Sequence, residues 1–219
     1  MPMWPRWPAR LRRGSADERV KAVKIALLHG WGFDAGVWDA LAPLLAGDVA
    51  RMDRGYFGAP VDAERPDLMI GHSLGAMLLA RRWSDVPLVA INGFDRFCGA
   101  DAVAPRVVAR MVKRFGEDPA KVLADFRATI HAAPAPAIVS GARLGADLAL
   151  LADETPAPAH RAPVLVLQAG DDPLLPPAMR AGAFAGGIER AAAVCPAGGH
   201  LLPLTQAAWC AQAIADFAR

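Results

Sequence analysis

The sequence predicts an α/β fold: a mostly parallel sheet of about six strands, with helices on both faces and an inserted helical cap. Two observations predict it. Short apolar runs typical of buried strands alternate with helical patterns along most of the chain. The alternation stops between about residues 93 and 161, where helical patterns follow one another directly. Strands that alternate with helices usually pair in parallel and are covered on both faces.

The composition is that of one compact domain. Of the 219 residues, 54% are hydrophobic and 21% are charged, which is enough for a sizeable core. The 24 Lys and Arg nearly balance the 22 Asp and Glu, which argues against a nucleic-acid-binding protein. No apolar run approaches the roughly 18 residues that a membrane span needs. The spacing of Cys98, Cys195 and Cys210 indicates neither a disulfide framework nor a metal site, so we expect a cytoplasmic protein. We also expect a monomer.

Residues 1–22 carry several Arg, Pro and Trp residues but lack the apolar stretch and cleavage site of a secretory signal. We expect a poorly ordered N-terminal arm here, followed by a single domain over residues 23–219. An amphipathic docking segment built on Trp4, Trp7 and Leu11, or a misassigned start, is the alternative.

The elements before the insertion follow from apolar runs and their spacing. Apolar residues at helical spacing predict a helix over residues 37–45, with Asp34 as its start signal. The stretch 53–66 is rich in turn residues, which indicates an abbreviated connection. The other predicted elements here are strands at 23–28, 49–52, 68–70 and 88–91 and a helix at 76–83.

Helical patterns within the insertion cover residues 102–115, 119–130 and 138–151. Beyond it, the alternation resumes. The predicted elements are strands at 164–168 and 191–194 and helices at 177–184 and 204–217.

The segment Gly71-His72-Ser73-Leu74-Gly75 matches the nucleophile-elbow pattern, in which a strand turns sharply into a helix and exposes a serine. A side chain at Gly71 or Gly75 would collide with the neighbouring strand and helix, so small residues are required there. The pattern alone also occurs in structural turns, but an apolar strand precedes it and a helical pattern follows. We therefore predict that Ser73 is a nucleophile.

A serine nucleophile needs a base, and the base needs a residue that orients it. His200 follows the last predicted strand and is the predicted base; a surface histidine is the alternative. His131 and His160, in or beside the insertion, are predicted to be solvated. Asp172 follows the strand 164–168 and is the predicted acid, with Asp171 as its competitor and turn formation as the alternative for both.

Acyl transfer also needs hydrogen-bond donors for the tetrahedral oxyanion. The backbone N–H groups of Leu74 and Trp31 are the predicted donors, because one follows the nucleophile and the other lies in the glycine-rich loop after the first strand. His29 precedes this loop and is predicted to shape it, with a second catalytic base as the alternative.

Over about residues 25–217 the chain resembles the α/β-hydrolase superfamily, and within it the pimeloyl-acyl carrier protein methyl ester carboxylesterases of biotin synthesis. The resemblance rests on the loop 28–32, on Trp38-Asp39, on the elbow and on the segments that hold Asp172 and His200. The chain lacks the first strands of that family, so we expect a reduced sheet of about six strands. The resemblance implies hydrolysis of a methyl ester on a pimeloyl chain carried by acyl carrier protein, without a metal or an organic cofactor.

The insertion also resembles the cap of that esterase, through Phe94 and Phe97 after the strand and through Arg110-Met111 and Phe126-Arg127. We expect a substrate- or carrier-binding role for residues of the insertion and for Trp31 in the loop after the first strand. These residues are Trp31, Phe94, Phe97, Arg106, Arg110, Met111, Lys113 and Phe126.

Arg106, Arg110 and Lys113 are spaced to share one face of the predicted helix 102–115, while Val107, Val108, Met111 and Val112 are predicted to pack inward. We expect the basic face to dock an acidic acyl carrier protein; a solvated face is the alternative. A broad carboxylesterase or thioesterase for small substrates, and a non-catalytic binding protein with the same fold, are the competing functions.

Overall fold

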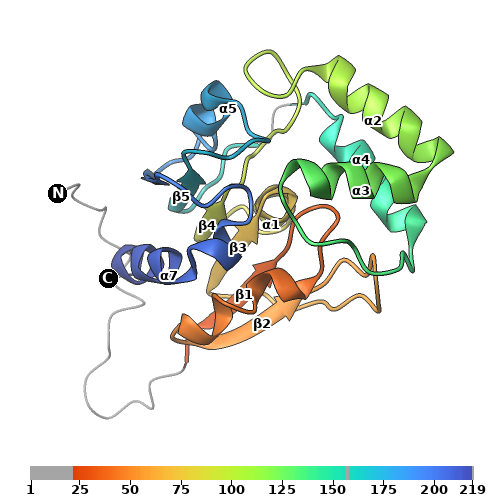
Figure 1. Ribbon diagram of the computed structural model, residues 1–219. Coiled ribbons are helices and arrows are strands. Elements are labelled where there is room, and N and C mark those ends of the chain that lie inside the picture. Colours follow the sequence, from red (N-terminus) through yellow and green to blue (C-terminus); the bar gives the residue numbers. More distant parts are fainter. Residues whose placement is uncertain (1–21, 156–157, 219) are drawn as a thin grey trace, which may run out of the picture.

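The computed structural model describes residues 22–155 and 158–218 (Figure 1). Six strands form one sheet in the order β2-β1-β3-β4-β5-β6, and every neighbouring pair is parallel. The strands are β1 (Lys24–Leu28), β2 (Asp48–Met52), β3 (Leu68–His72), β4 (Leu88–Ile91), β5 (Val164–Ala169) and β6 (Arg190–Cys195). The predicted sheet is confirmed. The predicted N-terminal arm, apart from Ala22, lies outside the described residues.

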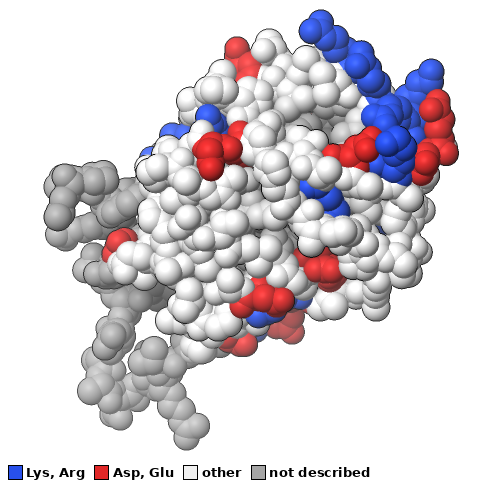
Figure 2. All heavy atoms as spheres, in the orientation of Figure 1, with Lys and Arg blue, Asp and Glu red and all other residues white. Residues whose placement is uncertain are grey.

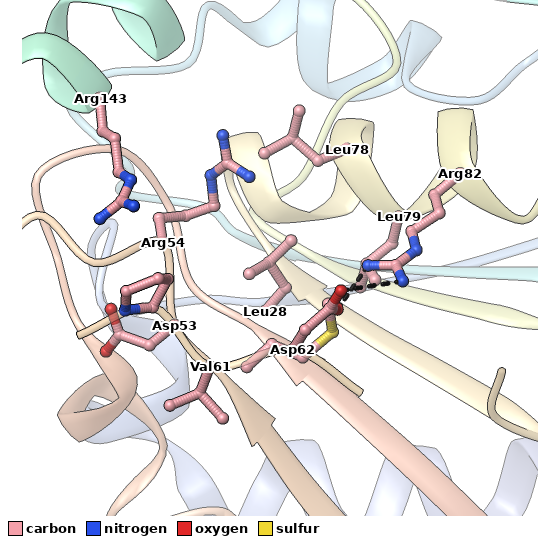
Figure 3. Close-up of a pocket in the computed structure, with 11 residues that line it drawn as sticks. Leu28, Asp53, Arg54, Val61, Asp62, Leu78, Leu79, Arg82 and Arg143 are labelled. Carbon is pink, nitrogen blue, oxygen red and sulfur yellow. Dashed lines mark hydrogen bonds and ion pairs between the residues drawn. The ribbon is translucent and has the colours of Figure 1, made fainter. Parts of the chain in front are cut away.

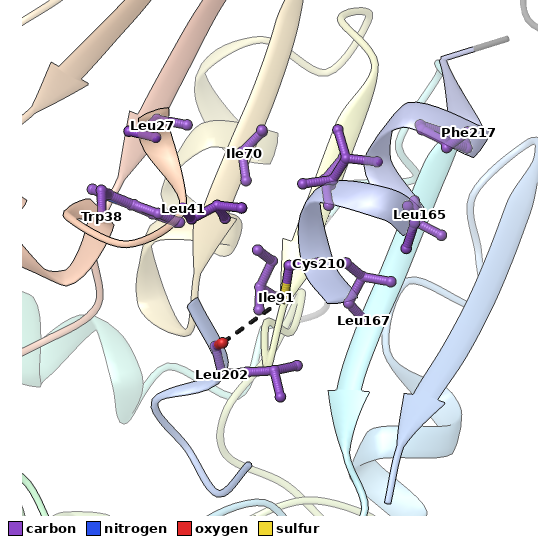
Figure 4. Close-up of a cluster of buried hydrophobic side chains, with 14 of the residues drawn as sticks. Leu27, Trp38, Leu41, Ile70, Ile91, Leu165, Leu167, Leu202, Cys210 and Phe217 are labelled. Carbon is purple, nitrogen blue, oxygen red and sulfur yellow. Dashed lines mark hydrogen bonds between the residues drawn. The ribbon is translucent and has the colours of Figure 1, made fainter. Parts of the chain in front are cut away.

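The four inner strands are buried almost throughout, whereas the edge strands β2 and β6 consist of exposed and partly buried residues up to a buried last residue. Helices cover both faces of a parallel sheet, so its inner strands are continuous apolar runs. On one face the strands pack against Trp38, Leu41 and the C-terminal helix, which ends at Phe217 (Figure 4). On the other face they pack against the helix that follows Ser73.

The predicted helix over residues 37–45 is wrong in type. The chain forms two short 3₁₀ helices instead, η2 (Ala35–Trp38) and η3 (Ala42–Leu44). Pro43 explains the break, because a proline inside an α-helix lacks the N–H and collides with the preceding turn. Asp34 does cap the first of them, since its carboxylate accepts the Gly36 N–H at 2.9 Å.

The remaining helices outside the insertion are α1 (Leu74–Arg82), α5 (Pro177–Gly182), α6 (Leu202–Thr205) and α7 (Ala207–Phe217). The predicted helix 204–217 is thus two helices, which meet at Gln206, whose backbone is not helical. None of the helices in the described ranges is long and apolar enough to span a membrane.

Between β4 and β5 the chain forms three helices, α2 (Pro105–Glu117), α3 (Pro119–Thr129) and α4 (Gly141–Leu151). Figure 1 shows them grouped on one side of the sheet. Their inner side chains form one apolar cluster with Leu74 and Met77 of α1. The insertion therefore covers the helix that starts at the nucleophile elbow.

A buried carboxylate holds α4 to the loop after β2. Asp147 is 1% exposed and accepts two hydrogen bonds from the Arg54 guanidinium, at 2.6 and 2.7 Å, and one from the Tyr56 hydroxyl at 2.6 Å. The Tyr56 carbonyl in turn accepts the N–H groups of Val139 and Ser140 just before α4. Burial, with Asp147 beside the hydroxyl, raises the pKa of Tyr56, so it stays a donor. The abbreviated 53–66 connection thus anchors the insertion.

We predict that Asp147→Ala lowers the free energy of unfolding by about 3 kcal/mol, because it leaves Arg54 and Tyr56 without their acceptor. The matched control is Asp125→Ala on α3, which removes a surface carboxylate paired with Arg114 and Lys121 and should cost much less, because water screens such pairs. Urea titration of both variants measures the difference. Equal losses would contradict the anchoring role of Asp147.

Candidate active site

The nucleophile elbow is a single strained residue between a strand and a helix. β3 ends at His72 and α1 begins at Leu74, and Ser73 between them has φ 54° and ψ −126°. Such a conformation costs a non-glycine residue about 1–3 kcal/mol. Backbone hydrogen bonds hold it on both sides: the Ser73 N–H donates to Ile91 at 3.1 Å, and the Ser73 carbonyl accepts from Ala76 at 3.1 Å.

Three glycines make room for this turn. A Cβ at Gly71 would lie 2.3 Å from the Ala76 Cα, and one at Gly75 would lie 2.1 Å from the Leu28 carbonyl oxygen. Both contacts are with backbone that cannot move aside. A Cβ at Gly30 would lie 2.8 Å from the Ser73 Cβ, so the loop after β1 directly contacts the serine. The collisions predicted at Gly71 and Gly75 are therefore real, and Gly30 adds a third.

His200 and Asp172 form a buried pair. The His200 Nδ1 donates to Asp172 Oδ2 at 2.8 Å, and neither side chain has any exposed surface. Burial alone would raise the pKa of Asp172, but the His200 hydrogen bond and the N–H groups of Leu174 and Leu175 hold it below its usual value. Because Nδ1 carries the proton, Nε2 is left as an acceptor; it is buried and has no partner among the described residues.

Asp171 does not reach the imidazole. Its carboxylate accepts the N–H of Gly199 at 2.8 Å and that of Gly198 at 3.2 Å, just before His200. These two hydrogen bonds lower the pKa of Asp171. The two neighbouring aspartates thus have different contacts: Asp172 binds the ring, and Asp171 binds the backbone of the turn.

Two buried side chains that the sequence analysis did not single out also contact this turn. His72 donates through Nε2 to the His200 carbonyl at 2.9 Å, and Asn92 donates to the carbonyls of Gly199 and His200 at 2.9 and 3.0 Å. Burial, with His200 nearby, lowers the pKa of His72 to about 3, so its ring is neutral at physiological pH. A polar residue directly after a buried strand was the available signal for Asn92.

The two predicted oxyanion donors have no hydrogen-bond partner in the described part of the chain. Within the described residues, the backbone N–H groups of Trp31 and Leu74 donate no hydrogen bond. His29 shapes the loop after β1, because its Nδ1 donates to the Gly30 carbonyl at 2.8 Å and its Nε2 accepts the Arg54 N–H at 3.0 Å. Both ring nitrogens are therefore used in structural bonds.

Arg127 of α3 supports the same loop and was missed as a site residue. It is almost fully buried, and it donates to the carbonyls of Gly32 at 2.8 Å and Ala133 at 2.6 Å while its guanidinium lies over the Phe33 ring. The resemblance gave Phe126-Arg127 as part of the cap but assigned no role to the arginine.

The aromatic residues expected to bind substrate lie in the apolar interior of the insertion. The Trp31 indole N–H donates to the Leu144 carbonyl at 2.8 Å, and its ring packs against Phe126. Phe94 and Phe97 are buried with their rings 5.0 Å apart. Met111 and Phe126 are half-buried in the same cluster. Ser73 is only 6% exposed, so the site is closed in this conformation.

The predicted basic face of α2 is exposed. Arg106, Arg110 and Lys113 are solvent-exposed. Their side chains form no hydrogen bond or ion pair within the part of the chain that the structure describes. Val108 is buried and Met111 and Val112 are half-buried as expected, but Val107 is 53% exposed. The prediction that Val107 packs inward is therefore wrong, because it lies toward the basic face.

The two other histidines near the insertion differ. His131 is exposed, as expected. His160 is 3% exposed and bonds through Nε2 to the Val86 carbonyl at 2.8 Å, so the expectation that it is solvated is wrong. It lies where the chain returns to the sheet and packs against the segment before β4.

A cavity of about 470 Å³ lies between the loop after β2, α1 and α4 (Figure 3). Leu28, Leu78 and Leu79 line one part of it. Two of its three arginines are already paired, Arg54 with Asp147 and Arg82 with Asp62. None of Ser73, Asp172 and His200 lines it, so it is separate from the buried pair.

No protein-family model and no curated protein matches the sequence. Solved structures do. An esterase from Thermogutta terrifontis is 21% identical, with 90% of this chain and 89% of that chain covered and a TM-score of 0.65. An esterase from Exiguobacterium antarcticum is 14% identical, with 90% and 92% covered and a TM-score of 0.72.

The enol-lactonase from Burkholderia xenovorans LB400 is 17% identical, with 91% of this chain and 93% of that chain covered and a TM-score of 0.68. At such sequence identities the structural similarity shows the fold and not the reaction. The all-parallel sheet, the elbow after β3 and these likenesses together show that the chain has the α/β-hydrolase fold.

Proposed function

We propose that the chain is a serine hydrolase that acts on carboxylic esters, with Ser73 as nucleophile, His200 as base and Asp172 as the residue that orients the base. The observation that carries the proposal is the buried hydrogen bond between Asp172 and His200 at the sheet edge where Ser73 stands in its strained turn. This arrangement gives an imidazole with a fixed Nδ1 proton and a free Nε2, as a general base requires.

In the proposed reaction the Ser73 oxygen attacks the ester carbonyl carbon while its proton passes to His200 Nε2. The protonated imidazole then gives the proton to the departing alcohol, and an acyl-enzyme remains. Water attacks that acyl group, again losing a proton to His200, which returns it to Ser73 as the acid leaves. The described residues contain no hydrogen bond between Ser73 and His200, so this bond must form for the first step.

The free N–H groups of Trp31 and Leu74 are the proposed oxyanion donors. Leu74 stands at the start of α1, where unpaired N–H groups and the helix dipole favour negative charge. Buried donors of this kind each contribute on the order of 10²- to 10³-fold in turnover. Arg127 and His29 bind the carbonyls of Gly32 and Gly30 and so fix the backbone on both sides of Trp31.

The proposed substrate is the methyl ester of a pimeloyl chain on acyl carrier protein, in biotin synthesis, in a cytoplasmic setting. The resemblance of the sequence supports it, and so do the unpaired cations on α2. Figure 2 shows Lys and Arg side chains gathered at the upper right of the view, over α2. A basic surface beside an exposed Val107 suits an acidic carrier. The direct test is mass spectrometry of the products from pimeloyl-carrier methyl ester; unchanged ester would contradict this substrate.

Two alternatives stay open. A broad carboxylesterase or thioesterase would use the same three residues, and it would turn over short aryl esters with no gain from a carrier-bound substrate. A non-catalytic binding protein would keep the fold as a ligand pocket, and its Ser73 would not react with a fluorophosphonate probe.

We predict that Ser73→Ala folds normally and lowers ester turnover roughly 10⁴-fold or more, because it removes one hydroxyl and with it the acyl-enzyme route. His200→Ala should lose about as much, and the double variant should be little worse than either, since the residues act as a unit. Steady-state kinetics with an aryl ester tests this. Substantial turnover by Ser73→Ala would reject Ser73 as the nucleophile.

We predict that Asp172→Asn lowers turnover by roughly 10²- to 10⁴-fold, because the amide NH₂ can donate to His200 Nδ1 and so favour the tautomer that carries its proton on Nε2. Asp171→Asn should lose less than about tenfold, the equivalent of roughly one hydrogen bond. The two variants differ by one position and one chemical change, so they control for each other in the same assay. A larger loss of turnover in Asp171→Asn than in Asp172→Asn would assign the orienting role to Asp171.

We predict that Arg106→Glu with Arg110→Glu weakens turnover of carrier-bound ester through a slower association rate. The loss should shrink at high salt, because the Debye length falls to about 3 Å at 1 M. Hydrolysis of a small free ester should barely change. Stopped-flow kinetics on both substrates measures it.

The matched control is Arg65→Glu with Arg161→Glu, the same change in net charge at exposed cations that precede β3 and β5. These positions lie at the amino ends of their strands, away from α2. Equal losses of turnover on both substrates in Arg106→Glu with Arg110→Glu would mean that the substitutions damage the insertion. No loss on either substrate would mean that the basic face is a solvated surface without a docking role.

A further inference from the structure

The turn with His200 and the loop with Asp172 are joined by more than the bond between those two side chains. Asp171 belongs to the loop and accepts two N–H groups of the turn, from Gly198 and Gly199. This tie lies at the surface, because Asp171 is exposed. A second tie lies in the interior.

The interior tie is Asn92, which follows β4 and has no exposed surface. Its amide nitrogen donates to the carbonyls of Gly199 and His200, and its amide oxygen accepts the Ala169 N–H at 2.8 Å, where β5 ends and the loop with Asp172 begins. One side chain therefore bonds to both segments.

The chemistry at position 92 is specific. Only an amide offers two donors and an acceptor at this size. Aspartate would put a charged acceptor against two carbonyls, and leucine would leave the Gly199 carbonyl and the Ala169 N–H without the partner that Asn92 supplies, although the His200 carbonyl would keep its bond from His72. Asn92 also has φ 43°, a left-handed conformation that asparagine tolerates better than most residues. Side chain and backbone both favour asparagine here.

The turn needs such ties because two glycines precede the histidine. Gly198 and Gly199 have φ 152° and 60°, conformations that side chains rarely adopt, and a flexible glycine pair gives the imidazole little rigidity of its own. Misplacing a catalytic group by about 1 Å costs roughly 10²-fold in rate. The backbone of the turn must therefore be fixed from outside.

We propose that Asn92 and Asp171 are positioning residues that fix the His200 turn against the Asp172 loop, one from the interior and one from the surface. This inference rests on the proposed function. Neither residue touches the reacting atoms; both act through the placement of His200.

The test compares Asn92→Leu and Asp171→Ala with the unmodified protein. We expect each to lower kcat about tenfold or more while KM stays within about twofold, because binding is unchanged and the base is misplaced. Asp171→Asn should lose less than Asp171→Ala, since it keeps one acceptor oxygen. The downfield proton NMR signal of the His200 Nδ1–H should broaden or vanish in Asn92→Leu and Asp171→Ala.

The matched control is Gln168→Leu. Gln168 is 3% exposed at the same sheet edge, and its amide donates to the Gly93 carbonyl at 3.1 Å but does not contact the turn. This variant should lose stability while keeping both kcat and the NMR signal.

The inference is overturned if Asn92→Leu and Gln168→Leu lower Tm alike while both keep a wild-type kcat and a wild-type NMR signal. Here kcat is calculated per active site, and the active sites are counted by titration with a fluorophosphonate. Should Asn92→Leu not fold, Asp171→Ala decides by the same readouts, because Asp171 is a surface residue. The NMR signal needs no substrate. A chain that shows the expected signal changes but hydrolyses no ester would contradict the proposed function and not the positioning.

Discussion

The approach of α1 to the sheet at Ser73 is the constraint on which the rest of the structure depends. One non-glycine residue must turn the chain from β3 into α1 at φ 54°, and the first turn of the helix then lies against the backbone of β1. Gly71 and Gly75 permit that approach, and Gly30 lets the loop after β1 reach the serine. The strain at the turn is offset by backbone bonds and by the apolar core on both faces of the sheet, and this packing keeps the hydroxyl in a single place.

The polar residues of the site gather because parallel strands all end at the same edge. β3 ends at His72, β4 is followed by Asn92, and β5 leads to Asp171 and Asp172. Each of these side chains bonds to the turn with His200, so a buried polar group at one strand end satisfies a backbone group from another. A polar network in the interior stabilises only when its members are paired. The unpartnered His200 Nε2 is an exception, and it is the nitrogen to which we assign proton transfer.

Much of the fold was predictable from the sequence, because the inner strands are continuous apolar runs and the elbow has a distinctive pattern. The pairing of a carboxylate after β5 with His200 followed from their order and their positions after strands, but these did not separate Asp172 from its neighbour Asp171. What escaped prediction depends on contacts between distant residues: Asp147 lies about 90 positions from Arg54 and Tyr56, and no local pattern marks it. The broken helix at residues 37–45 is a different case, since Pro43 was visible but was outweighed by the apolar spacing.

The insertion is hydrogen-bonded to the loops after β1 and β2. Leu144 accepts from Trp31, Arg127 donates to Gly32, and Asp147 holds the loop after β2. Exchange of this cap for that of another protein with the same fold would therefore also remove supports of the loop that holds the proposed oxyanion donor. A chimera with a new cap would therefore also need, in the loops after β1 and β2, the residues with which that cap forms its hydrogen bonds. Under the proposed function, the residues that select the substrate and those that fix the catalytic geometry would form overlapping sets.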